Sequence, residues 1–255
     1  MYKIFKRFFD IIISLVSLIV LSPVFLILFL LVGIFNGFPV IFSQPRPGKG
    51  GKIFMMYKFR SMTNKTDSDG NLLPDSKRVT KLGAFIRKTS LDELPQLWNV
   101  LKGDMSLVGP RPRLIKDAIF YPSYTKSLDV RPGITCLAHI NGRNNNTWES
   151  VFIYDSIYVN KMSFWLDIKI MFKTVSAVLK KTGANDGTQD LQDYYYADYL
   201  LRVGKINQDE YTQGINKAKR IEKEFRSSRG FRKKYSLKKT YAEQEDFDLQ
   251  ERNVD

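Results

Sequence analysis

The feature that most constrains this chain is an apolar run near its N-terminus, DIIISLVSLIVLSPVFLILFLLVGIFNGF. Residues 11–35 carry no charged side chain. As a helix they would measure roughly 38 Å, enough to cross a hydrocarbon core of about 30 Å. A cleaved signal peptide fits poorly, because the run is too long and no small-residue cleavage site follows it. The run therefore predicts a segment that enters a membrane.

A proline interrupts this run at its middle. Ser22–Pro23 leaves about 18 Å of helix on each side, and neither half can cross a bilayer alone. Proline removes a backbone donor and clashes with the preceding turn, so it kinks or breaks a helix. Basic residues flank both ends of the run, and the positive-inside rule draws both to the cytoplasmic side. We expect a re-entrant helix–break–helix that enters and leaves one leaflet; a kinked spanning helix is the alternative.

The charge balance limits the partners. The chain has 40 Lys and Arg against 26 Asp and Glu, a formal net charge of +14. Anionic partners are expected: acidic lipid, a phosphorylated substrate or nucleic acid. The single cysteine, Cys136, excludes an intramolecular disulfide and fits a reducing compartment, and the single histidine, His139, argues against multi-histidine metal sites. Chemistry must then use carboxylates, hydroxyls, Lys, Arg or a hard metal ion.

The residues after the apolar run predict an α+β domain that is mainly helical. The expected elements are, in order, strands near 39–43 and 53–59 joined by a Pro/Gly turn, a surface loop over 63–78, and short helices over 80–89 and 90–102. Gly103 should end the second helix. The GPRPR segment, residues 109–113, should be extended, because residues that precede proline avoid the α region. Residues 130–146 are expected to be loop or irregular strand.

A further amphipathic helix is predicted over residues 162–183, MSFWLDIKIMFKTVSAVLKKTG. Its bulky apolar side chains recur near helical spacing, with lysines opposite. This stripe could pack in the core. It could equally lie in a membrane interface, where tryptophan and lysine are favoured. The sequence leaves both open.

The composition changes again near residue 186. We therefore expect three parts: 1–36, the membrane helix; 37–185, a domain at the cytoplasmic face; and 186–255, a helical C-terminal extension. The extension predicts two short amphipathic helices with a turn at Gly204, followed by a charged, disordered tail. It could bind a partner or mediate self-association.

Two adjacent acids, Asp92 and Glu93, stand out in this basic chain. One interpretation is a helix start, since Ser90 and Glu93 match a capping box and acids favour the first turn. A second interpretation is compatible with it, because helix N-termini also bind anions. An ionised Asp there can be a nucleophile toward phosphorus or a ligand for Mg²⁺, which prefers one or two carboxylates plus substrate phosphates.

The cations around the acid pair support the second interpretation, in which the site binds phosphate. Arginine forks match phosphate oxygens bidentately, and a stiff loop lowers the entropy cost of placing them. The candidates are Arg87, Arg111 and Arg113 nearby in the sequence, with Lys58, Arg60, Arg131 and Arg143 from other loops. Together with the apolar segment, they indicate phosphoryl transfer at a bilayer surface.

Several motifs carry a resemblance to a known family. They are KRFFD near the N-terminus, the SP break, KFRSM, SLDELPQLWNVLKGDMSLVGPRP, and VRPGIT followed by NGRN. The chain resembles the monotopic phosphoglycosyl transferases of bacteria, the sugar transferases that initiate surface-glycan assembly on polyprenyl phosphate. The resemblance runs from about residue 3 to residue 182. The part after about residue 186 lies outside the family core.

The resemblance implies a mechanism and a location. A re-entrant hairpin broken at Ser22–Pro23 would hold catalysis at the cytoplasmic face of the bacterial cytoplasmic membrane. Asp92 would attack the β-phosphate of a UDP-sugar, releasing UMP and forming a phosphosugar–aspartyl intermediate, which polyprenyl phosphate then attacks. Glu93 would assist acceptor activation or metal binding, with Mg²⁺ bridging Asp92 and the diphosphate. The phosphate binders implied are Arg87, Arg111 and Arg143, with Lys58 and Arg60 as weaker candidates.

The sequence departs from the family pattern after RPGIT, where it reads Cys136, Leu137, Ala138 and His139. His139 could contact the nucleotide or sugar, or be an ordinary loop histidine. Other functions remain to be weighed: a polybasic membrane scaffold whose acids only cap a helix, or glycosyl transfer that releases UDP. No nucleic-acid-binding motif is present, so nucleic acid is not an expected partner.

Overall fold

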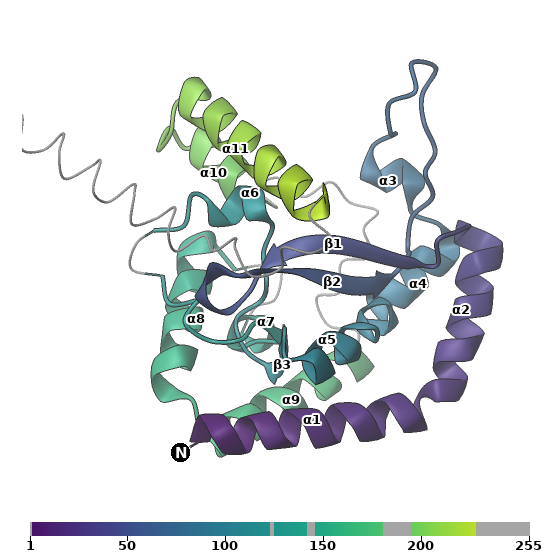
Figure 1. The fold of residues 1–255 in the computed structure, drawn as a ribbon, viewed down its shortest axis with the longest axis vertical. Helices are drawn as coiled ribbons and strands as arrows, with labels where there is room; N and C mark the ends of the chain where they lie inside the picture. Colours follow the sequence, from purple (N-terminus) through teal and green to yellow (C-terminus); the bar gives the residue numbers. More distant parts are fainter. Residues whose placement is uncertain (1, 123–124, 142–145, 181–194, 228–255) are drawn as a thin grey trace, which may run out of the picture.

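Figure 1 shows the computed structural model of the chain, which describes residues 2–122, 125–141, 146–180 and 195–227. These residues are mainly helical, with a two-stranded antiparallel sheet and a short parallel strand pair. The α+β, mainly helical class predicted from the sequence is confirmed at this level.

The described elements run, in chain order, as α1 (Tyr2–Val20), α2 (Ser22–Asn36), β1 (Ile41–Pro47), the 3₁₀ turn η1 (Lys49–Gly51), β2 (Ile53–Phe59), α3 (Asp75–Arg78), α4 (Lys81–Lys88), the 3₁₀ turn η2 (Leu91–Glu93), α5 (Gln96–Lys102), β3 (Ser106–Val108), α6 (Ile115–Ala118), β4 (Gly133–Thr135), α7 (Leu137–Ile140), α8 (Trp148–Lys161), α9 (Phe164–Leu179), α10 (Tyr196–Arg202) and α11 (Gln208–Ser227).

The N-terminal apolar run forms α1 and α2, which meet at a bend of 64°. The bend lies beside Ser22–Pro23, where the sequence predicts the break. Pro23 stands in the first turn of α2, where a missing backbone donor costs little. No single helix among the described residues has the length and apolar character to cross a membrane, whereas the bent pair together meets that test.

The hairpin of β1 and β2 crosses the middle of the molecule (Figure 1). Its register runs from Ile41 opposite Phe59 to Pro47 opposite Ile53. β1 extends further than the sequence predicted, since it continues through Pro45 and Pro47. Each strand of a two-stranded sheet has a free edge, and proline is tolerated where its nitrogen faces that edge. The turn is correspondingly shorter than expected.

The segment around the acid pair differs from the single helix predicted over 90–102. Ser90 adopts a left-handed conformation, φ 57°, and its side chain caps nothing. A single 3₁₀ turn, η2, carries the acids, and α5 begins only at Gln96. The capping-box interpretation is therefore wrong, because the Glu93 side chain bonds to cations instead. The predicted end at Gly103, φ 88°, is confirmed.

A short parallel pair, β3 and β4, holds the GPRPR segment. β4 lies where the sequence predicted loop or irregular strand. Gly109 and Gly133 let the two backbones approach closely: a Cβ on Gly133 would lie 2.1 Å from the Gly109 nitrogen. The Gly133 N–H donates to the Pro110 carbonyl at 2.9 Å. The start of the proline-rich loop is thus fixed by backbone contacts that no side chain could replace.

The amphipathic helix predicted over 162–183 forms as α9, and it lies beside α1 (Figure 1). Several large side chains of its apolar stripe are exposed: Trp165 is 76% exposed, Phe172 73% and Val175 58%, whereas Ile168 and Met171 are half-buried. The core interpretation is therefore wrong for the exposed side chains. Bulky apolar side chains are exposed on α1 and α2 as well. All three helices thus present apolar surface.

The described part of the extension, α10 and α11, forms the two expected helices, with the turn at Gly204, φ 71°. They lie on the side of the molecule opposite α1 (Figure 1). Tyr196 of α10 packs against Trp148 and Phe152 of α8, so α10 shares a core cluster with the middle part of the chain. The tail predicted to be disordered lies outside the described residues.

Candidate active site

The acid pair faces the strand β2. η2 presents Asp92 and Glu93 toward Lys58, whose Nζ lies 2.7 Å from Glu93 Oε1 and 3.9 Å from Asp92 Oδ2. All three side chains are largely buried. The hairpin thus brings a lysine onto two carboxylates that lie more than thirty residues further along the chain.

Glu93 is held by two cations. Besides Lys58, the Arg111 guanidinium donates to the same oxygen, Oε1, at 2.7 Å. Burial disfavours the charged form of Glu93, but the charges and hydrogen bonds of Arg111 and Lys58 outweigh it and hold its pKa below the usual range. Glu93 is therefore an ionised carboxylate that fixes the two cations at the site.

Asp92 has different surroundings. It is 7% exposed and accepts no hydrogen bond from any residue that the structure describes. Burial raises its pKa to about 6; Lys58 opposes the shift, Glu93 adds to it, and Arg87 and Arg111 oppose it. Its carboxylate is thus surrounded by cations and yet uncommitted.

The other predicted cations are placed differently. Arg87, in the last turn of α4, donates through Nε to Ser61 Oγ at 2.7 Å, and its charge acts on Asp92. Arg60 instead donates to the Phe38 carbonyl at 3.0 Å, and no described contact brings it to the acid pair. Arg143 lies outside the described residues.

The structure adds Asn99, which sequence reasoning missed. Its side chain donates to the Met55 carbonyl at 2.7 Å and accepts from the Tyr57 N–H at 3.1 Å. The carboxamide thereby pairs with the free edge of β2 as another strand would, and it holds Lys58 in register with α5. A polar residue in the middle of the apolar α5 pattern, LWNVL, was the available signal.

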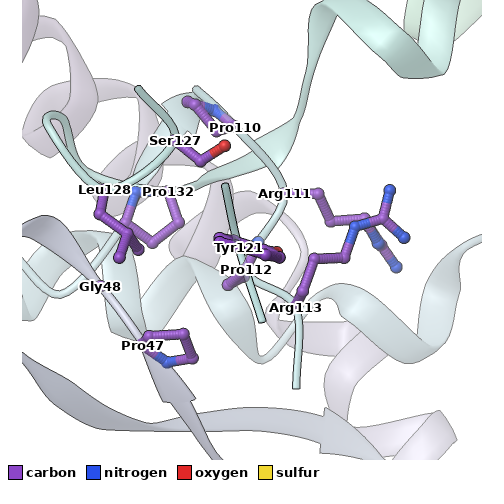
Figure 2. A pocket seen from close by; sticks show the side chains of 10 residues that line it. All are labelled: Pro47, Gly48, Pro110, Arg111, Pro112, Arg113, Tyr121, Ser127, Leu128 and Pro132. Atoms are coloured by element: carbon purple, nitrogen blue, oxygen red, sulfur yellow. The ribbon is translucent and has the colours of Figure 1, made fainter. Parts of the chain in front are cut away.

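The proline-rich loop forms one side of the site. Figure 2 shows the side chains that line a small hollow beside this loop, with Arg111 and Arg113 extending to the same side. The hollow is lined by Pro47, Gly48, Pro110, Arg111, Pro112, Arg113, Tyr121, Ser127, Leu128 and Pro132. Arg111 is the residue of this loop that reaches the acid pair.

The positions that depart from the family pattern lie mostly in the core. Cys136, Leu137 and Ala138 are buried at the start of α7. Burial raises the pKa of the Cys136 thiol to about 11, so the thiol stays neutral at physiological pH. His139 is partly buried on the same short helix. Cys136, Leu137 and Ala138 therefore serve packing around α7.

The acid pair is the candidate place for Mg²⁺. The described residues contain no cluster of three or more His, Cys, Asp or Glu side chains. Mg²⁺ does not require one, because it often binds one or two carboxylates together with substrate phosphates and water. The uncommitted Asp92 carboxylate fits this role. Glu93 fits it less well, since two cations already occupy one of its oxygens.

The class of protein follows first from the site and the fold. The buried acids and the cations around them form an enzyme site for an anionic substrate, and the chain that carries this site presents apolar helices. The comparisons with known proteins then supply the family. The chain belongs to the bacterial sugar transferase family, whose model matches residues 1–181. Prediction of this family from the sequence is confirmed.

Similar proteins with sugar-transferase names agree with this family assignment. The chain is 50% identical over 184 residues to the uncharacterized sugar transferase EpsL of Bacillus subtilis (strain 168), covering 71% of this chain and 90% of that protein. It is 41% identical over 204 residues to the undecaprenyl-phosphate galactose phosphotransferase of Salmonella typhimurium (strain LT2), covering 71% and 42%. It is 45% identical over 184 residues to the UDP-glucose:undecaprenyl-phosphate glucose-1-phosphate transferase of Klebsiella pneumoniae, covering 68% and 39%.

The match thus spans less than half the length of the last two relatives and nearly all of the first. With the family, these relatives confirm the class of enzyme predicted from the sequence, a phosphoglycosyl transferase.

Proposed function

We propose that this enzyme transfers a sugar-1-phosphate from a UDP-sugar to polyprenyl phosphate (undecaprenyl phosphate), releasing UMP. The observation that carries the proposal is Asp92, a buried carboxylate among cations that accepts no hydrogen bond from the described residues. A carboxylate without donors keeps its lone pairs available to attack phosphorus. The names of the Salmonella and Klebsiella relatives support the donor and acceptor classes.

The chemistry proceeds in two displacements at one phosphorus. An Asp92 oxygen forms a bond to the β-phosphorus of the donor, and the bond from that phosphorus to the UMP oxygen breaks. An oxygen of polyprenyl phosphate then attacks the same phosphorus and releases Asp92. The covalent step separates the two encounters, so a soluble donor and a lipid acceptor need not be bound together. Polyprenyl-diphosphate-sugar is the product.

The neighbouring side chains have distinct roles. Arg111 and Lys58 bind the donor phosphates, and Glu93 holds both cations in place before the donor arrives. Arg87 adds positive charge near Asp92. Asp92 is the residue that would hold Mg²⁺ together with the donor phosphates. Bound there, the ion would neutralise developing charge on the diphosphate.

The location follows from the apolar helices. We propose that α1 and α2 form the re-entrant hairpin, entering and leaving the inner leaflet at Ser22–Pro23. The exposed stripe of α9 would lie in the interface beside them, with the catalytic domain at the cytoplasmic face. This arrangement would bring the acid pair to the depth of a lipid-bound phosphate.

The biological role would be to initiate a surface glycan: capsule, exopolysaccharide, O-antigen or glycoprotein glycan. Another relative, 37% identical over 200 residues, is the exopolysaccharide production protein ExoY of Rhizobium meliloti (strain 1021). That name supports the role in polysaccharide synthesis.

The test is nucleotide release by purified protein with Mg²⁺, undecaprenyl phosphate and a panel of UDP-sugars. UMP released with one sugar, and absent for Asp92→Asn, would establish the reaction and identify the donor. Asp69→Asn, in an exposed loop, is the matched control and should release UMP at the wild-type rate. Release of UDP would contradict the proposal in favour of glycosyl transfer. No release with any donor would favour the non-enzymatic scaffold.

A further inference from the structure

The C-terminal helices α10 and α11 pack against α6, the short helix that follows the loop carrying Arg111. The Asp117 carboxylate of α6 accepts hydrogen bonds from the backbone N–H groups of Tyr196 (2.9 Å) and Ala197 (3.4 Å). These groups open α10, whose own cap residue makes no side-chain hydrogen bond. The first turn of α10 is thus capped by a carboxylate from another part of the chain.

α11 packs on the same region through a glycine. Gly214 faces Phe120, just beyond α6, and a Cβ at position 214 would lie 2.1 Å from the ring. One and two turns further along, Ala218 and Ile221 are buried in the same cluster as Ile115 of α6. Close-packed interiors transmit displacements, so a shift of α11 moves α6 with it.

A stack of side chains makes a second connection. The Arg113 guanidinium carbon lies 4.9 Å from the centre of the Trp148 ring, and the Trp148 and Tyr196 ring centres are 5.1 Å apart. Both rings are buried. Arg111 is two residues before Arg113, with Pro112 between them, and the fixed φ of proline limits independent movement of the two arginines. This stack connects α10 to the loop that carries Arg111.

We propose that α10 and α11 position Arg111 for donor binding, with Tyr196 and Gly214 as positioning residues. This inference rests on the proposed function, because it assumes that Arg111 meets the donor phosphates. The helices lie beyond residues 1–181, the part that matches the family. They would therefore be an addition of this chain to the shared catalytic core, acting through a side chain of that core.

The test uses full-length protein carrying Gly214→Leu, with Gln213→Leu as the matched control on the exposed side of the same helix. Leucine favours helix more than glycine does, so a defect at 214 reflects packing against Phe120 and not a weaker α11. We expect Gly214→Leu to raise the KM for the UDP-sugar at least about threefold, with kcat and the KM for polyprenyl phosphate little changed. The control should match the wild type in all three.

A double-mutant cycle with Arg111→Ala tests whether the C-terminal helices affect donor binding through Arg111. If the extension acts through Arg111, the KM ratio caused by Gly214→Leu should fall to about one once Arg111 is absent. An unchanged ratio in that background, or an equal rise in the KM of both substrates, would overturn the inference. Tyr196→Leu, which removes the ring stack, provides the same cycle if Gly214→Leu does not fold.

The two proposals fail in different ways. If wild-type protein releases no UMP with any donor, the proposed function is wrong and the inference with it. If wild-type protein releases UMP but the cycle is additive, only the inference is wrong.

Discussion

Asp92 and Asp167 are equally buried, each 7% exposed, yet their surroundings differ. Asp167, on α9, accepts hydrogen bonds from the Tyr2 hydroxyl, the Lys6 ammonium and the Tyr158 hydroxyl. Asp92 accepts none from the described residues. The first carboxylate is fully committed to joining α1, α8 and α9, whereas the second has only the Lys58 ammonium 3.9 Å away.

The comparison shows that two equally buried carboxylates can differ in how far their desolvation is compensated. A buried carboxylate is tolerated when donors and a counter-ion replace its water, as at Asp167. At Asp92 the cations lie nearby, but no hydrogen-bond donor from the described residues reaches the carboxylate oxygens, so part of the desolvation cost remains. Such a cost is typical of groups kept reactive for catalysis. The same substitution at the two positions should therefore have opposite consequences.

The largest expected effect is on catalysis at Asp92. Asp92→Asn preserves shape and burial but removes the nucleophile, so UMP release should fall by at least about 10³-fold. Intact-protein mass spectrometry after mixing with donor alone should show a phosphosugar adduct on the wild type and none on the variant. An adduct that persists in Asp92→Asn would show that another residue is the nucleophile.

Asp167→Asn should instead affect stability. It leaves the buried Lys6 ammonium without its counter-ion, which should lower the free energy of unfolding by about 2–4 kcal/mol. The kcat of the protein that remains folded should stay within a few-fold of wild type. Thermal unfolding and UMP release, measured in the same detergent, separate the two quantities. A selective loss of kcat with unchanged Tm would contradict the structural role of Asp167 and would show that it belongs to the active site.

The Arg111 guanidinium, which is bonded to Glu93, should be required for its shape as well as its charge. Arg111→Lys keeps the charge but loses the planar fork, so kcat/KM for the donor should drop about 10- to 100-fold. Lys102→Arg, a conservative exchange at a partly exposed ion pair with Asp104, is the control and should be silent. An equally small effect at Arg111 would mean that a point charge is sufficient there.

The smallest expected effect is a gain in stability at Asp92, and it depends on pH. Burial raises the pKa of Asp92 to about 6, above its unfolded value, so its contribution to stability is present at low pH and is lost as the pH rises through about 6. The Asp92→Asn side chain does not ionise, so the variant does not lose stability as the pH rises.

The variant should therefore be more stable than wild type by about 1–2 kcal/mol at pH 8, and the difference should vanish near pH 4. Thermal unfolding without added Mg²⁺ at both pH values measures it. A variant less stable than wild type at pH 8 would show that Asp92 has donors after all, and the contrast with Asp167 would disappear.

Much of the fold near proline and glycine could be predicted from the sequence. The bend beside Pro23, the end of α5 at Gly103 and the turn at Gly204 all lie where expected. These residues act on their own backbone, so neighbours in the sequence suffice to predict them. The parallel pair of β3 and β4 could not be predicted, because its stability depends on a backbone approach between distant glycines.

The candidate site was likewise predictable from the sequence only in part. The motif around Asp92 and Glu93 identified the acids and most of their cations, but it suggested the wrong role for Glu93 as a helix cap. The sequence also could not separate Lys58, which reaches the pair, from Arg60, which turns to Phe38. Lys58 lies within β2, whereas Arg60 lies just beyond the end of the strand, where the backbone takes a different course.

By itself, then, the sequence determined where the chain bends, which residues carry charge and which family the chain belongs to. Only the tertiary structure decided that Asp167 is held by three hydrogen bonds while Asp92 accepts none from the described residues, and that Trp165 and Phe172 of α9 are exposed. The physical reason is distance along the chain. Backbone preferences are local, whereas Lys6 and Asp167, which lie 161 residues apart in sequence, meet only after folding.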